Sequence, residues 1–179
     1  MMTNSLMNLF RAGGVAVVLA AVGLASQPVA AANAPTPINK FTDWSASTYD
    51  DGGKTLCYAT SDPKKQAGKF SSRGKPYIAI THAPQANVRD QVSYVAGYDI
   101  KPDSVVKVTI GKQSFQLELL QKDRAWAKNS DIDKQLVAAM RKGNTLTIQG
   151  TSTRGTGSTD TFSIKGLAQA MDRVAQDCK

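Results

Sequence analysis

Short segments in which apolar and polar residues alternate run through most of the chain, and this period-two pattern predicts β-strands. The first two segments, residues 44–49 and 54–60, are separated by two aspartates and two glycines. Because glycine adopts the positive φ angles of tight hairpin turns, this arrangement predicts a β-hairpin. Residues 77–82 and 91–98 are rich in β-branched and aromatic side chains, which indicates two further strands.

The clearest hairpin is predicted for residues 104–110 and 114–120, with a two-residue turn formed by a glycine and a lysine. That turn places apolar residues of the two strands opposite each other on one face. The predicted pairs are Val106 with Leu117 and Val108 with Phe115.

The last two strand candidates, residues 145–149 and 159–164, flank a stretch of glycine, serine and threonine around Arg154. A glycine-rich stretch can cradle a phosphate, but residues 150–158 lack the Gly-Lys-Ser/Thr ending of a P-loop and do not open a helix. A flexible connection is therefore the favoured interpretation of this stretch.

Two segments repeat apolar residues at the spacing of a helix, which is three or four positions. The first, residues 131–142, is expected to start at an N-cap formed by Ser130 and to stop at Gly143. The second starts at residue 167 and continues toward the C-terminus. The predicted buried stripes are Ile132, Leu136 and Met140 in the first helix and Leu167, Met171, Val174 and Cys178 in the second.

Together these elements predict a mainly β fold, an antiparallel sandwich or partly closed barrel with one internal and one C-terminal helix. Residues 41–179 are expected to form this β-rich domain. Residues 33–40 contain two prolines and are expected to be a flexible leader.

Residues 1–32 have the pattern of a secretory signal peptide. Arg11 supplies the positive charge, residues 12–25 form an apolar run, and three alanines at 30–32 offer a cleavage site. The run has 14 residues, fewer than the roughly 20 needed to cross a bilayer, so a retained membrane anchor is not expected. The sequence therefore predicts a periplasmic, outer-membrane-associated or secreted protein.

Export affects how the net positive charge and the two cysteines are interpreted. Cleavage after Ala32 removes one of 22 cations and leaves 21 against 14 acidic residues, a net charge of +7. In an exported protein this charge points to anionic envelope or host-surface components as partners, and not to nucleic acid. Two cysteines in an oxidising compartment predict a disulfide between Cys57 and Cys178, with two free thiols as the alternative.

Several short motifs resemble those of the invasion-associated locus B family of exported alphaproteobacterial proteins. Their order along the chain and the positions of the two cysteines carry the resemblance, which spans nearly all of the mature chain. The motifs are Trp-Ser-Ala-Ser-Thr-Tyr at 44–49, Leu-Cys-Tyr-Ala at 56–59, Tyr-Val-Ala-Gly-Tyr at 94–98, Ala-Trp-Ala at 125–127, Val-Ala-Ala-Met-Arg-Lys-Gly at 137–143, Gly-Thr-Ser-Thr-Arg-Gly-Thr at 150–156 and Asp-Thr-Phe-Ser-Ile-Lys-Gly at 160–166. The resemblance implies a protein of the periplasm or outer membrane, in some pathogens involved in host-cell entry, with no established enzymatic activity or cofactor.

The best candidate binding segment is residues 61–75, which is expected to be a long exposed basic loop. Several cations within a dozen residues can sum their attraction over an anionic surface. The candidate anion-binding residues are Lys64, Lys65, Lys69, Arg73 and Lys75. The alternative interpretation is an ordinary solvated connection.

Residues with catalytic potential are scarce, so the sequence favours a non-catalytic protein without a cofactor or metal. His82 is the only histidine, which excludes metal sites built from several histidines. The competing hypothesis is a small periplasmic hydrolase or a thiol-redox protein that uses His82 or the pair Cys57 and Cys178.

Five aromatic residues could line a carbohydrate or peptide groove, although core positions are expected for them. They are Trp44, Tyr58, Tyr94, Tyr98 and Trp126.

Overall fold

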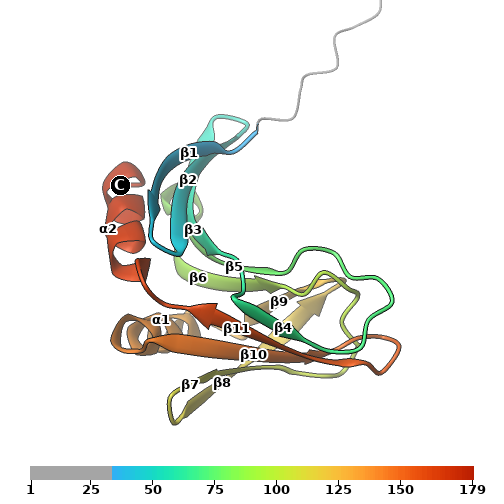
Figure 1. Cartoon of the computed structure of the whole chain (residues 1–179). Coiled ribbons are helices and arrows are strands. Elements are labelled where there is room, and N and C mark those ends of the chain that lie inside the picture. Colours follow the sequence, from blue (N-terminus) through green and yellow to red (C-terminus); the bar gives the residue numbers. More distant parts are fainter. Residues whose placement is uncertain (1–33) are drawn as a thin grey trace, which may run out of the picture. The chain divides into compact units, whose positions relative to one another are not determined.

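A computed structural model describes residues 34–179, which form one antiparallel sheet of eleven strands with two α-helices (Figure 1). The predicted signal peptide, residues 1–32, lies outside the described residues. The strands are β1 (Thr36–Phe41), β2 (Trp44–Asp51), β3 (Lys54–Ser61), β4 (Lys65–Ala67), β5 (Tyr77–Ala83), β6 (Val88–Val95), β7 (Val106–Ile110), β8 (Gln113–Gln121), β9 (Arg124–Ala127), β10 (Thr145–Thr151) and β11 (Gly157–Ser163). The helices are α1 (Ser130–Lys142) and α2 (Leu167–Asp177), and a short 3-10 turn, η1 (Pro84–Ala86), joins β5 to β6.

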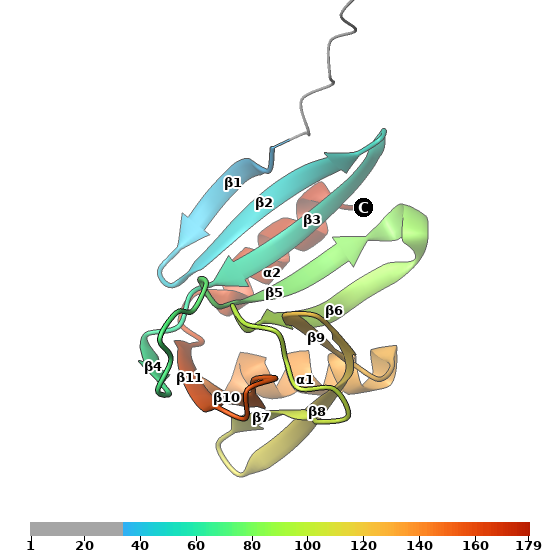
Figure 2. The same cartoon turned by 90° about the vertical axis from the view of Figure 1, so that its right-hand side faces the viewer.

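Across the sheet the strand order is β1-β2-β3-β5-β6-β9-β8-β7-β10-β11-β4. The outer strands β1 and β4 do not pair with each other, so the sheet is open. This arrangement confirms the predicted mainly β, antiparallel class with one internal and one C-terminal helix. Figure 2 shows α2 behind β2, β3 and β5, and α1 behind the lower strands of the sheet.

Both predicted hairpins are confirmed. In the first, Asp51 pairs with Lys54, and the two-residue turn between them has φ angles of 62° at Gly52 and 85° at Gly53. In the second, the register is the predicted one. The observed pairs are Val106 with Leu117 and Val108 with Phe115. Local turn chemistry thus determined the pairing of these strands.

Three strands have no counterpart in the sequence-based expectation, and two of them correct it. Residues 33–40 are not a flexible leader throughout, because Thr36–Phe41 pairs with β2 as β1. Residues 61–75 are not a loop throughout, because Lys65–Ala67 pairs with β11 as β4. The third, β9, pairs with β6 and β8 and so joins the two halves of the sheet. The local hydrophobic pattern did not reveal these three strands, because each is defined by its pairing with another strand.

The helices follow the predicted stripes, although the N-cap of α1 differs. Asn129, and not Ser130, caps α1, since its side-chain oxygen accepts a hydrogen bond from the backbone N–H of Ile132 at 3.1 Å. Leu136 and Met140 are fully buried, and Ile132 is partly buried against the core. Asp133 is buried, and its carboxylate accepts a hydrogen bond of 2.9 Å from the N–H of Val92 in β6.

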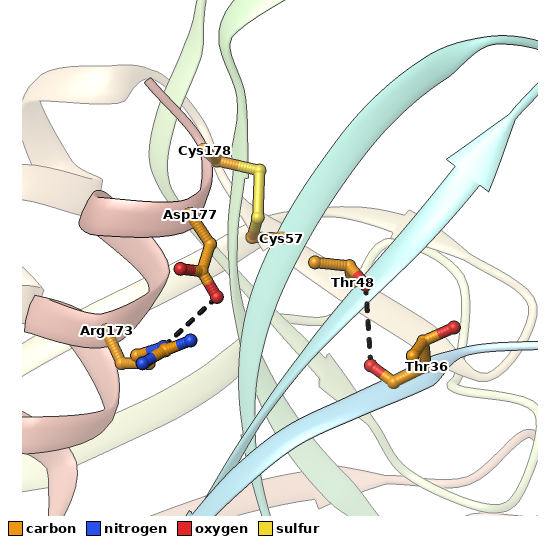
Figure 3. Close-up of a disulfide and its surroundings, with 6 residues drawn as sticks. All are labelled: Thr36, Thr48, Cys57, Arg173, Asp177 and Cys178. Carbon is orange, nitrogen blue, oxygen red and sulfur yellow. Dashed lines mark hydrogen bonds and ion pairs between the residues drawn. A yellow bond between two sulfur atoms is a disulfide. The ribbon is translucent and has the colours of Figure 1, made fainter.

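The C-terminal helix α2 packs on the half of the sheet that contains β1, β2 and β3. It buries Leu167, Met171 and Val174 as predicted, together with Ala170. Its end places Cys178 next to Cys57 of β3, with an S–S distance of 2.04 Å and a Cα–Cα distance of 5.9 Å (Figure 3). The disulfide therefore joins the early hairpin to the last helix across 121 positions of sequence.

Hydrogen bonds also join the start of β2, near one edge of the sheet, to the end of β11, near the other edge. The indole N–H of Trp44 at the start of β2 donates to the backbone carbonyl of Ser163 at the end of β11, at 3.0 Å. The N–H of Asp43 donates to the carbonyl of Lys165 at 3.2 Å. Trp44, Tyr94 of β6 and Phe162 of β11 are fully buried. The rings of Tyr94 and Phe162 meet edge to face. The interior of the bent sheet is thus filled by large side chains from both halves.

Candidate anion-binding site

The cations of the basic segment, residues 61–75, differ in their surroundings. Lys64 lies 2.5 Å from a carboxylate oxygen of Asp43, and Lys75 lies 3.0 Å from one of Asp62. Both lysines are more than half exposed, so these ion pairs are screened by water and leave the charges accessible. Lys65 and Lys69 are exposed and form no ion pair with another described residue.

Arg73 is not an exposed cation, which corrects its place among the candidate anion-binding residues. Its side chain is 9% exposed, and its guanidinium donates to both carboxylate oxygens of Asp160 in β11, which is fully buried. The same guanidinium donates to the hydroxyl of Tyr94 at 3.1 Å and to the carbonyl of Ala96 at 2.8 Å. Its charge is therefore balanced inside the protein by that of Asp160.

The buried cluster of Arg73, Asp160 and Tyr94 is held together by charge-assisted hydrogen bonds. The Tyr94 hydroxyl donates to Asp160 at 2.5 Å. Burial, and then the hydrogen bond to Asp160, raise the pKa of Tyr94 well above its usual range, so its hydroxyl stays protonated. Burial is the largest single effect on the pKa of Arg73 and lowers it, but the hydrogen bonds to Asp160 and the charge interactions with Tyr94, Asp160 and Tyr98 together raise it. The cluster fixes residues 68–76 against β6 and β11.

Two aromatic rings extend this cluster toward the surface. Phe70 and Tyr98 stack with their ring centres 5.0 Å apart and their planes inclined by 15°. The Arg73 guanidinium lies 5.2 Å from the centre of the Phe70 ring and 5.1 Å from that of Tyr98, within the range of cation–π attraction. The Tyr98 hydroxyl lies 2.5 Å from the hydroxyl of Ser158. Tyr98 is therefore fixed at both its ring and its hydroxyl.

A cleft of about 420 Å³ opens beside these rings. Three segments that are distant in sequence line it, namely residues 69–74, 97–99 and 152–156. Figure 1 shows the corresponding green, yellow-green and orange loops on the side of the sheet away from α2. Lys69 comes from the first segment and Arg154 from the third, and both are exposed. We call this feature the basic cleft.

Backbone hydrogen bonds hold the three segments in place. The N–H of Gly74 donates to the carbonyl of Gly97 at 2.8 Å, and the N–H of Thr153 donates to the carbonyl of Asp99 at 2.9 Å. The turn that carries Arg154 is closed by bonds between Ser152 and Thr156, one of which the Ser152 hydroxyl accepts at 3.1 Å. The walls of the basic cleft are thus preformed, which lowers the entropy lost when a ligand binds.

We expect Gly97→Ala to destabilise the domain more than Gly155→Ala does. Both glycines have positive φ, 73° and 82°, and substitution of an alanine there costs about 1–2 kcal/mol from the backbone alone. A Cβ on Gly155 meets no atom within 4 Å, whereas one on Gly97 clashes with the backbone carbonyl of Gly74. The clash should add about 1–3 kcal/mol to the loss in unfolding free energy. Denaturant unfolding of both variants measures this difference, and equal losses would show that the contact between Gly74 and Gly97 adapts freely.

The residues of the enzyme hypothesis are placed away from solvent. His82 is 5% exposed, and its Nε2 lies 3.0 Å from a carboxylate oxygen of Asp90. Cys57 is directly opposite His82 in the pairing of β3 with β5, but both cysteines are buried and joined to each other. Thiolate chemistry requires a free and accessible sulfur, which this arrangement does not offer. Within residues 34–179, no three His, Cys, Asp or Glu side chains gather at metal-binding distance.

The comparisons with known proteins agree with this fold. A family model described as "Invasion associated locus B (IalB) protein" matches residues 44–175, which include all three segments of the basic cleft. The chain belongs to the invasion-associated locus B family. The crystal structure of invasion associated protein B from Bartonella henselae is similar to this locus B chain, with 14% sequence identity and a TM-score of 0.51. The match covers 77% of this chain and 94% of that one, and at this identity it shows a shared fold. No curated protein sequence matches the chain.

Sequence reasoning located only half of the basic cleft. The cations of residues 61–75 were visible as a cluster, and Arg154 stood out in its glycine-rich stretch, but no local pattern connects them. Phe70, Tyr98 and Asp99 join the same cleft because β4 and β11 pair and because residues 99–101 bond to residues 151–153. The one signal of the cleft in the sequence was the presence of cations in two separate polar segments.

Among the described residues, neither helix has the length and apolar character needed to span a membrane.

Proposed function

We propose that this locus B protein is exported and acts without catalysis, binding anionic envelope or host-surface components through the basic cleft and the other exposed cations of the basic segment, residues 61–75. The cations that carry the binding are Lys65, Lys69 and Arg154. Lys64 and Lys75 belong to the same basic segment as Lys65 and Lys69 and add to its positive field, although Asp43 and Asp62 offset part of their charge. Arg73 has a structural role, because it holds the loop that bears Lys69 against Asp160.

One observation carries the proposal. Lys69 and Arg154 come from segments far apart in the sequence, yet they line one cleft, and neither forms an ion pair with another described residue. Cations that only improve solubility do not need to converge on a concave, preformed surface. Cations that converge there raise the local concentration of an anionic partner and add their attractions.

Export is supported by two independent features. Residues 1–32 have the charge, the apolar run and the small cleavage-site residues of a signal peptide. The disulfide between Cys57 and Cys178 suits an oxidising compartment such as the periplasm or the cell exterior.

We expect the variant with Lys65, Lys69 and Arg154 all changed to Gln to lose most of its binding to acidic polysaccharide. The wild type should bind at 0.1 M salt and be released by 1 M salt, since the Debye length falls from about 10 Å to about 3 Å. Co-sedimentation with an insoluble acidic polysaccharide across that range measures both effects.

The matched control removes three charges elsewhere, with Lys54, Lys112 and Lys142 changed to Gln. These lysines are exposed, and none lines the basic cleft. The control variant has the same net charge as the test variant and should retain its binding. Equal losses in the two variants would mean that the total charge of the protein, and not the basic cleft, attracts the polyanion.

A further inference from the structure

We propose that the basic cleft is a pocket for one acidic sugar unit, a pyranose that carries a carboxylate or a phosphate, and not only a charged patch. This inference rests on the proposed function and adds to it the chemistry of the bound unit. Four properties of the cleft support it, namely its size, its hydroxyl groups, its aromatic wall and the presence of one carboxylate among the cations.

The size of the cleft suits a small ligand. Its volume of about 420 Å³ lies within the range of small-molecule pockets, which is roughly 300–1,000 Å³. A flat patch that attracts polyanions by charge alone needs no such volume. Because the walls are fixed by backbone hydrogen bonds from Gly74 and Thr153, the cleft does not have to form when a ligand arrives.

The lining groups match the surface of a sugar. The hydroxyls of Ser71, Ser72 and Thr153 form no hydrogen bond within the described part of the chain, so they are available to ring hydroxyls. Phe70 and Tyr98 supply apolar surface for the C–H groups of a pyranose. Lys69 and Arg154 supply charge-assisted donors for the acidic substituent.

Asp99 distinguishes a sugar from a bare anion. It is exposed and is the one acidic residue that lines the basic cleft. Its carboxylate would repel a bare inorganic anion, because like charges at short range raise the free energy of binding. A sugar, in contrast, offers hydroxyl donors to a carboxylate, and such hydrogen bonds are among the stronger ones.

The cleft fits a sugar better than a membrane surface. A protein that inserts into lipid presents exposed apolar side chains, such as those of amphipathic membrane-binding helices. The exposed large apolar residues of the described chain are Val105 and Leu119, and neither lines the basic cleft. The groups at its mouth are cations and hydroxyls.

The proposal is tested with four probes, titrated into the wild-type protein and followed by NMR chemical shifts. Trigalacturonate carries carboxylates, glucose 1-phosphate carries a phosphate, and maltotriose and inorganic phosphate are the controls without charge and without sugar. We expect at least one acidic sugar to bind saturably and to shift the amides of Gly97, Asp99 and Thr153. Maltotriose and inorganic phosphate should bind at least about tenfold more weakly, because each lacks one of the two recognised features. The two acidic probes distinguish a carboxylate from a phosphate as the charged group.

Two variants sharpen the test. Changing both Lys69 and Arg154 to Gln should weaken acidic-sugar binding about tenfold or more, while Arg89→Gln with Lys112→Gln, two exposed cations outside the cleft, should not. Asp99→Asn should weaken sugar binding although it removes a negative charge. Tighter acidic-sugar binding by Asp99→Asn would overturn the proposal, as would inorganic phosphate binding as strongly as both acidic sugars.

The outcomes also separate this proposal from the proposed function. If acidic polysaccharide still co-sediments in a salt-sensitive way but neither acidic sugar binds in the cleft, the sugar pocket is wrong and the broader function stands. If an acidic sugar binds in the cleft but no acidic polysaccharide co-sediments, the pocket stands and the broader function is wrong. Absence of both kinds of binding overturns both.

Discussion

Asp160→Asn is expected to lower the free energy of unfolding by about 3–5 kcal/mol, because it leaves the guanidinium of Arg73 buried without a counter-charge. Asp160 is fully buried, and Arg73 is 9% exposed, so water cannot replace the lost partner. Since small domains are stable by roughly 5–15 kcal/mol, this change removes a large share of the total. Denaturant unfolding monitored by near-ultraviolet circular dichroism measures it.

Two further variants separate the effect of charge from that of packing. Tyr94→Phe keeps the ion pair and removes both hydrogen bonds of the hydroxyl, the one that it donates to Asp160 and the one that it accepts from Arg73. Because each charge keeps its counter-charge, the cost should be about 1.5–3 kcal/mol, below that of Asp160→Asn. Adding Arg73→Met to Asp160→Asn removes the uncompensated charge and should restore part of the stability. If Asp160→Asn alone costs less than about 1 kcal/mol, a typical neutral hydrogen bond, then the charge of Arg73 is solvated in the folded protein.

Loss of the disulfide is expected to have an effect of similar size. Cys57 and Cys178 are separated by 121 positions, and in the chain-entropy treatment a loop of this length contributes about 4–5 kcal/mol, as an upper value. Cys178→Ser should therefore lower the melting temperature by roughly 10–20 °C in a domain of this size. Non-reducing mass spectrometry of tryptic peptides should show the two segments linked in the wild type.

The control for this prediction is the double variant with both cysteines changed to Ala. It leaves no thiol that can form a wrong bridge, and its stability should match that of Cys178→Ser within about 1 kcal/mol, the scale of one packing or hydrogen-bonding contact. A fall of only a degree or two in either variant would show that the packing of α2 alone closes the loop. Leu167, Met171 and Val174 supply that packing.

The disulfide and the buried ion pair stabilise different parts of the fold. The disulfide fixes α2 to β3, and the cluster of Arg73, Asp160 and Tyr94 fixes residues 68–76 between β6 and β11. The second of these bears directly on the basic cleft, because Arg73 lies in the segment that carries Lys69. We therefore expect Asp160→Asn to weaken ligand binding as well as stability, even though Asp160 does not line the cleft.

Much of the fold was predictable because it depends on short-range features. A two-residue turn at Gly52 and Gly53 determines the pairing of β2 with β3, and a similar turn determines that of β7 with β8. The stripe of Leu167, Met171 and Val174 determines which side of α2 is buried. Ser130 was the wrong N-cap because neighbouring Asn129 is also a strong capping residue, and only the backbone geometry decides between them.

The strands β1, β4 and β9 were not predictable from local pattern. The three residues of β4 are all exposed, so they show no alternation of buried and exposed positions. β9 has four residues and is defined by its partners β6 and β8. Strand pairing of this kind depends on contacts between residues far apart in the chain, which a hydrophobic pattern does not encode.

By itself, the sequence of this protein determined the class of the fold, the two helices, the pattern of an export signal, the basic character and the cysteine pair. The fold class, the helices and the export signal depend on residue type and on spacing within a few positions, and the basic character and the cysteine pair depend on composition. Only the tertiary structure decided which cations are accessible. Arg73 and Lys69 are four positions apart and look equivalent in the sequence. Both border the cleft, yet Arg73 is nearly buried and paired with Asp160 of β11, whereas Lys69 is exposed. The pairing of β4 with β11 decides this difference, because it brings a buried carboxylate beside one arginine and leaves the lysine at the surface.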